Sequence, residues 1–265
     1  MLYLITFILL ILIVAVTLWS NRSDLSPRIL NDPLAPKPLE TLFDKIDSTP
    51  DSPVGFGYKI SWLAIKTPDA KTVLDTLHIE NVQPANWNTG VIAAYNGHTF
   101  ISPPINGWVL VVSYHLPELG KEPEPDGLTP LLTILSQEFG EVQYFGTHRV
   151  VEYHAWSRYI NGSEIRAFAY LGESDEILAN RGADTEEEEE LGYEYFDPDS
   201  PDADSDSYWE REDLCYPDET HVMEVAGLWS VNPTALEDLE LPNSAGWIGN
   251  LVDLSDEMMP QKTVS

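Results

Sequence analysis

The dipeptide Asn161-Gly162 constrains the fold of this 265-residue chain more than any other feature. It separates two β-prone runs, VVEYHAWSRYI at 150–160 and SEIRAFAYLG at 163–172. Asn and Gly both tolerate a positive φ, which the type I′ turn of a two-residue hairpin requires. The sequence therefore predicts a β-hairpin over Val150–Gly172. The turn sets the first pairs of its ladder, which are Ile160 with Ser163 and Tyr159 with Glu164.

The rest of the register follows from the turn, because successive side chains of a strand point to opposite faces. Trp156 is then expected to face Ala167, and His154 to face Ala169. Large side chains opposite alanines predict a shallow recess on one face of the hairpin. The candidate binding residues on this face are Glu152, His154, Trp156 and Arg158.

Charge narrows the classes of partner. The chain has 14 basic and 44 acidic residues, which gives a net charge of −30. Nucleic acid is excluded as a partner, since phosphate contacts need Lys and Arg. A basic protein is the natural complement of such a surface. Arg158 and Arg166 are rare cations in an acidic chain, and we expect both to pair internally with carboxylates.

More than half of the net charge lies in the segment Asp184–Glu219, which holds 17 acidic residues and one basic residue. Thr185–Leu191 is expected to form a helix, because Glu in the first turn suits the helix dipole. Phe196–Ser207 has the low complexity of a mobile loop, so we predict an acidic mobile insertion over 184–213. The candidate binding residues here are Glu186, Glu187, Glu188, Glu189, Glu190, Tyr208 and Trp209.

The N-terminal run Leu2–Trp19 has no charged residue and is just long enough to span a bilayer as a helix. We predict a transmembrane anchor at 1–20 and a linker at 21–53. A cleaved signal peptide is the alternative, although no basic residue precedes the run. Arg22 and Arg28 follow it, which favours a cytoplasmic globular domain over a periplasmic one.

The globular domain is expected at 54–252, followed by a tail at 253–265. Thr67-Pro68 and Thr129-Pro130 predict helix starts, and Gly140 a helix end. Asn96-Gly97 predicts a second hairpin between Val91–Tyr95 and His98–Ser102. Trp108–Tyr114 is apolar throughout and predicts a central strand. The fold class is α+β, with a mostly antiparallel sheet, two or three packed helices and a strand–helix–strands unit that is repeated at Phe56–Tyr114 and Leu128–Leu171.

Motifs for cofactor chemistry are missing from the sequence, including phosphate loops, dinucleotide fingerprints and paired cysteines, so we predict no cofactor and no metal. The acidic repeat from Asp202 to Asp206 has Ser207 where a calcium loop needs glycine. Cys215 is the single cysteine, which rules out an internal disulfide. With His221 or His154 it would make a nucleophile–base pair, although no motif supports one.

Three stretches resemble a pattern shared by a family of uncharacterised bacterial proteins. They are Trp156-Ser157-Arg158, Arg166-Ala167-Phe168-Ala169-Tyr170 and Trp229-Ser230-Val231-Asn232-Pro233. The resemblance covers 144–236 and brings no known activity with it. It implies a bacterial setting and favours the inner membrane as the site of the predicted anchor.

These observations predict a membrane-anchored acidic protein-binding module. Its most concrete form is an immunity-type protein that neutralises a basic bacterial toxin, since opposite charge speeds capture. The first alternative is an enzyme with a small-molecule or hydrolytic site at Glu152 and His154. The second alternative is a structural protein of the cell envelope.

Overall fold

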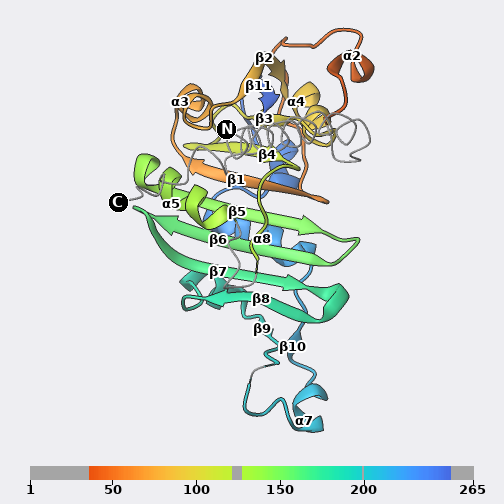
Figure 1. The fold of residues 1–265 in the computed structure, drawn as a ribbon, viewed down its shortest axis with the longest axis vertical. Helices are drawn as coiled ribbons and strands as arrows, with labels where there is room; N and C mark the ends of the chain where they lie inside the picture. The colour runs from red at the N-terminus through yellow and green to blue at the C-terminus, as the bar shows by residue number, and fades with distance from the viewer. Residues whose placement is uncertain (1–35, 121–126, 199, 252–265) are drawn as a thin grey trace, which may run out of the picture. The chain divides into compact units, whose positions relative to one another are not determined.

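The computed structural model describes residues 36–120, 127–198 and 200–251. These residues fold around one nine-stranded sheet with helices on both faces (Figure 1). Every strand pair of this sheet is antiparallel. The predicted α+β class with a mostly antiparallel sheet is therefore confirmed.

The large sheet has the strand order β2-β11-β3-β4-β1-β5-β6-β7-β8. Its strands are β1 (Ile60–Lys66), β2 (Glu80–Asn86), β3 (Thr99–Ile101), β4 (Trp108–Ser113), β5 (Glu141–His148), β6 (Tyr153–Ile160), β7 (Ser163–Leu171), β8 (Glu176–Arg181) and β11 (Ala245–Asn250). Two short parallel strands, β9 (Glu194–Tyr195) and β10 (Leu214–Cys215), form a separate pair beyond β8 (Figure 1).

The helices divide the core into two layers. One layer holds α3 (Ala70–Thr76) and α5 (Leu128–Phe139), whose apolar residues pack with β1 residues such as Leu63. The other holds α4 (Trp87–Ala94) and α8 (Glu219–Trp229), which pack with Trp62. The shorter helical elements are α2 (Leu39–Leu42), η3 (Gly172–Ser174), α6 (Glu186–Leu191), α7 (Asp206–Trp209) and η4 (Pro233–Asp238).

Burial on both faces explains the apolar run of β4, in which every residue from Trp108 to Ser113 is buried. This strand lies inside the sheet between β3 and β1, as the sequence predicts for a central strand. The predicted helix end at Gly140 is also confirmed, because Gly140 caps α5 with a φ of 83°. A left-handed residue at this position is the usual way to end a helix.

The predicted second hairpin is wrong. Residues 87–94 form helix α4, which begins after Asn86, whose side chain accepts a hydrogen bond from the Thr89 amide. Gly90 lets this helix lie against Phe100, since a Cβ there would come within 2.2 Å of the ring. Asn96-Gly97 therefore follows a helix rather than joining two strands. The two predicted strand–helix–strands units consequently differ in their element order.

The central hairpin is present, but its register departs from the predicted one. Ile160 pairs with Ser163 and Tyr159 with Glu164, as predicted. A β-bulge then leaves Ile165 without a partner strand residue, and Arg158 pairs with Arg166. From this point each residue of β7 is shifted by one, so that Trp156 faces Phe168 and His154 faces Tyr170.

The bulge sorts side chains by size between the two layers. Ala167 and Ala169 turn to the layer of α5, which packs closely over β5, β6 and β7. Phe168 and Tyr170 turn to the layer of α8. A bulge inserts one residue in one strand, and this is enough to exchange the faces of everything beyond it.

The predicted anchor at 1–20, the first part of the predicted linker at 21–35 and the predicted tail at 253–265 lie outside the described residues. Among the helices that are described, none is both long and apolar enough to cross a membrane. Residues 36–53 of the predicted linker are described, and they include α2 and Asp51. Both carboxylate oxygens of Asp51 accept hydrogen bonds from the first amides of α4, those of Trp87 and Asn88.

Candidate functional site

The predicted recess on the hairpin is filled. Trp156 is fully buried and stacks on Phe168, with ring centroids 4.6 Å apart. His154 is buried as well. Glu152 precedes β6 in a turn with a φ of 55°, and it is exposed. The four residues predicted on one face therefore do not line an open site, because the bulge replaces alanines by Phe168 and Tyr170.

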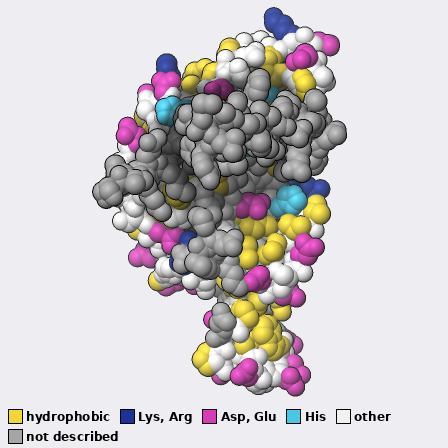
Figure 2. Space-filling view, in the orientation of Figure 1, with side chains coloured by type: hydrophobic (Ala, Val, Ile, Leu, Met, Phe, Trp, Pro, Cys, Tyr) yellow, Lys and Arg dark blue, Asp and Glu magenta, His cyan; other side chains and the backbone are white. Residues whose placement is uncertain are grey.

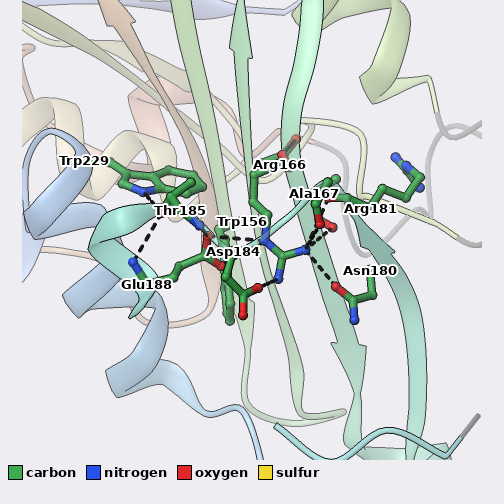
Figure 3. Close-up of polar contacts among 11 residues, drawn as sticks. Trp156, Arg166, Ala167, Asn180, Arg181, Asp184, Thr185, Glu188 and Trp229 are labelled. Atoms are coloured by element: carbon green, nitrogen blue, oxygen red, sulfur yellow. Dashed lines mark hydrogen bonds and ion pairs between the residues drawn. The ribbon is translucent and has the colours of Figure 1, made fainter. Parts of the chain in front are cut away.

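Helix α6 covers part of this buried face. It begins at a capping box, in which the Thr185 side chain accepts from the Glu188 amide and the Glu188 carboxylate accepts from the Thr185 amide. The box turns Glu188 toward the sheet, where its carboxylate also accepts from Trp156 Nε1 at 2.7 Å. One glutamate of the predicted acidic row is thus buried, and it joins the helix to the central hairpin (Figure 3).

Arg166 is the other half of this attachment. Its guanidinium, with 1% of the side chain exposed, donates to Glu188 at 3.1 Å and to Asp184 at 2.7 Å. It also donates to the side-chain oxygen of Asn180 on β8 at 2.7 Å. Figure 3 shows the guanidinium between Asp184 and Asn180, with Glu188 on the side of α6. The prediction that Arg166 pairs internally is confirmed.

Arg158 lies directly across the ladder from Arg166. Two cations in neighbouring positions of a sheet repel each other unless carboxylates intervene. The Arg158 side chain donates to Glu141 at 2.9 Å and to Glu187 at 3.5 Å. Asp184, Glu187 and Glu188 therefore neutralise two arginines of the sheet, which makes the start of the acidic segment part of the folded body.

The remaining glutamates of α6 point outward. Glu186, Glu189 and Glu190 are exposed, and all three lie within two turns of the helix. Their carboxylates form a row of negative charge on the surface above the buried Glu188. On α6 this row is the accessible part of the predicted site, whereas Trp156 and His154 of β6 are buried.

The chain then forms a small acidic lobe, which we define as residues 193–198 and 200–217. The lobe contains β9, α7 and β10 and lies beyond the edge strand β8 (Figure 1). It carries eight Asp or Glu residues and one Arg. Figure 2 shows hydrophobic side chains gathered on it with acidic side chains around them.

The two predicted aromatic residues of this lobe have different roles. Tyr208 is buried, and its hydroxyl accepts from the Asp197 amide at 2.6 Å. Trp209 is exposed over 43% of its surface. Tyr216, which we did not select from the sequence, is exposed over 51% and stacks on the buried Phe196 at 4.8 Å. Tyr216 follows β10 directly, and the sequence patterns did not predict that short strand, so they did not identify Tyr216 as a candidate binding residue.

Cys215 and His221 are in contact, with 3.3 Å between Sγ and Nε2. The Asp218 amide donates to His221 Nδ1 at 2.9 Å, so the imidazole proton lies on Nε2 and points at the thiol. In this tautomer the ring cannot accept the proton of the thiol. Burial raises the pKa of the Cys215 thiol and lowers the pKa of His221. The geometry therefore disfavours a thiolate nucleophile.

Acidic clusters also raise the question of a metal. Within 36–120, 127–198 and 200–251, no group of three or more His, Cys, Asp or Glu side chains is placed to hold an ion. His154, which we predicted as a binding residue, instead contacts Thr147 through Nδ1 at 3.3 Å. The chemistry that remains is that of exposed carboxylates beside exposed aromatic rings.

These surface residues carry the candidate site on their geometry alone. No family model, no curated protein and no solved structure matches this chain.

Proposed function

We propose that this chain is a membrane-anchored acidic module that binds a basic protein, and that it acts as an immunity-type protein against a basic bacterial toxin. Leu2–Trp19 would hold it in the bacterial inner membrane, with the globular domain on the cytoplasmic side. The outward row of Glu186, Glu189 and Glu190, together with the acidic lobe, would attract the partner.

The observation that carries this proposal is that some acidic residues of this segment pair with arginines while others are exposed and unneeded for that pairing. Asp184, Glu187 and Glu188 pair with the arginines of the sheet, whereas the three outward glutamates of α6 are exposed. Exposed charges of one sign raise the association rate of an oppositely charged partner. Three carboxylates of this segment thus pair with arginines of the fold, whereas the three outward glutamates of α6 are open to solvent.

The enzyme alternative has weaker support. This alternative requires Glu152 and His154 to act together. Glu152 precedes β6 and is exposed, whereas His154 lies within β6 and is buried. The contact of Cys215 with His221 has the wrong tautomer for base catalysis. A surface role agrees better with these positions than a hydrolytic site does.

Capture from bacterial cells tests the proposal. Full-length tagged protein, extracted in mild detergent at low salt, should enrich a basic protein, and the complex should dissociate at high salt. The triple variant E186Q/E189Q/E190Q should lose most of this partner, and expression of the native chain should relieve the toxicity of the partner in the same cells.

The matched control is E80Q/E138Q/E240Q, which removes three charges from exposed positions elsewhere. It should retain the partner, because the net charge is the same in both variants and only the location differs. Recovery of no basic protein, or equal loss in the two variants, would overturn the proposal.

A further inference from the structure

We propose that Trp209 and Tyr216 form an arginine-selecting contact on the acidic lobe, where guanidinium groups of a cationic polypeptide stack on the two rings. This inference rests on the proposed function, because it specifies which cations the acidic surface receives. It goes further in assigning the selectivity to aromatic rings rather than to charge.

Exposure and packing single out these two rings. Both are large apolar side chains with about half of their surface open to solvent. On their inner sides they contact the same buried residue, Phe196, with centroid distances of 6.1 Å for Trp209 and 4.8 Å for Tyr216. The rings therefore belong to one cluster with a supported inner side and an open outer side.

The rings are also held in place. Trp209 Nε1 donates to the backbone oxygen of Ala203 at 2.8 Å, which fixes the orientation of the indole. Tyr216 stacks on Phe196 with an interplanar angle of 29°. A ring that is already ordered loses little conformational entropy when a partner binds, so such rings are efficient contacts.

Arg211 is an example, within the lobe, of how an aromatic ring and carboxylates bind a guanidinium group. Its group lies 5.8 Å from the ring centre of Tyr208 and donates to Glu194 and Asp213, both at 2.6 Å. An aromatic face and two carboxylates thus hold one arginine. Exposed carboxylates also lie close to both rings in the chain, with Glu210 next to Trp209 and Asp218 two residues after Tyr216.

The positions of the other cations leave these two rings open. Within the described residues, the rings that have a Lys or Arg over them are those of Trp108, Tyr58, Trp229, Phe168 and Tyr208. The expected occupant is an arginine-rich segment, because a planar guanidinium stacks on a ring and pairs with carboxylates at the same time. A lysine ammonium is more strongly hydrated and gains less from the rings.

The experiment compares two labelled peptides of equal length and charge, one with arginines and one with lysines at the same positions. Each is titrated against the full chain in mild detergent, and binding is followed by fluorescence anisotropy. The native protein should bind the arginine peptide about tenfold more tightly, which two exposed cation–π contacts can supply. W209A/Y216A should abolish this difference and change the affinity for the lysine peptide less than about twofold.

Two further variants separate loss of contact from loss of structure. W209F/Y216F keeps an aromatic ring at each position and should retain most of the selectivity. Leu228→Ala removes an equally exposed apolar side chain from α8 and should have no effect. Equal affinities of the native protein for both peptides, or selectivity that survives W209A/Y216A, would overturn this inference and leave charge-driven capture standing. Failure to bind either peptide would overturn the proposed function as well.

Discussion

Arg166 is the residue on which the attachment of the acidic segment depends most. It is buried, and it donates to Glu188, Asp184 and Asn180 from a single guanidinium group. A buried ion pair adds little net stability over an apolar pair of the same shape, but the loss of one partner leaves the other charge buried and unpaired. The effect of a substitution at this position is therefore large and asymmetric.

We expect Arg166→Met to lower the free energy of unfolding by about 3–5 kcal/mol, because the Glu188 carboxylate loses its cation in a buried setting. Urea unfolding measures the change. Arg211→Met is the control, since Arg211 also pairs with two carboxylates but lies at the surface. Its loss should be much smaller, because an ion pair at the surface is screened by solvent and adds little stability. Equal losses would show that Arg166 does not stabilise a buried charge.

His154 gives the folded protein a dependence on pH. Burial lowers its pKa from 6.5 to about 4, against the opposing effect of the Asp218 carboxylate. As the pH falls below 6.5, the His154 side chain therefore takes up a proton in the unfolded chain but stays neutral in the folded chain. The stability that His154 contributes is present above pH 6.5 and is lost as the pH falls toward 4, by about 2 kcal/mol at pH 5.

The measurement is the free energy of unfolding of native protein and His154→Asn at pH 7 and pH 5. The variant should lose less stability over this interval than the native protein does. His78→Asn, at an exposed histidine, should keep the native dependence. If His154→Asn follows the native curve, then the histidine titrates normally in the folded protein.

At the scale of elements, α6 is a short helix that its first turn holds in place. The helix has six residues, too few to be stable by itself in water. Its attachments are the ion pairs of Glu187 and Glu188 and the contacts of Thr185, whose hydroxyl also accepts from Trp229 Nε1 at 3.1 Å. The position of the outward glutamates therefore depends on residues that do not face the partner.

Thr185→Ala should loosen this helix by about 1 kcal/mol, since it removes the capping hydroxyl. Amide exchange of Glu188 and Glu189, which donate to Thr185, should become about fivefold faster. Thr185→Ser keeps the hydroxyl and should keep the native exchange rates. An unchanged rate in Thr185→Ala would mean that the buried ion pairs alone hold the helix.

At the scale of the whole molecule, the charge balance of 14 basic to 44 acidic residues sets the response to salt. Most of the excess carboxylates repel one another, because nearby cations are too few to pair with them. Self-repulsion destabilises the compact state, and salt screens it. The protein should therefore become more stable as the salt concentration rises, even though its surface ion pairs weaken.

Urea unfolding at about 0.05 M and 0.5 M sodium chloride measures this effect, as the Debye length falls from well above to well below 10 Å over that range. The midpoint should move to higher urea with added salt. A fall in the midpoint would show that the ion pairs, and not the excess charge, dominate the electrostatic free energy. Urea is used since it carries no charge.

The sequence by itself determined the features that depend on neighbouring residues. Asn161-Gly162 determined the central turn and its first two pairs, and Gly140 determined the end of α5. The charge count predicted that Arg158 and Arg166 each pair with carboxylates, because the chain has few cations and many carboxylates. These predictions need only local backbone preferences and charge counts.

Tertiary packing decided the rest. The bulge at Ile165 depends on which side chains fit under α5 and α8, and that choice involves residues far apart in the chain. The same holds for Asn96-Gly97, which ends a helix because α4 packs on Phe100. The inward turn of Glu188 requires Arg166, which the bulge places on that face. Local chemistry sets a turn over a few residues, whereas the face that each strand residue occupies depends on the layers that pack against it.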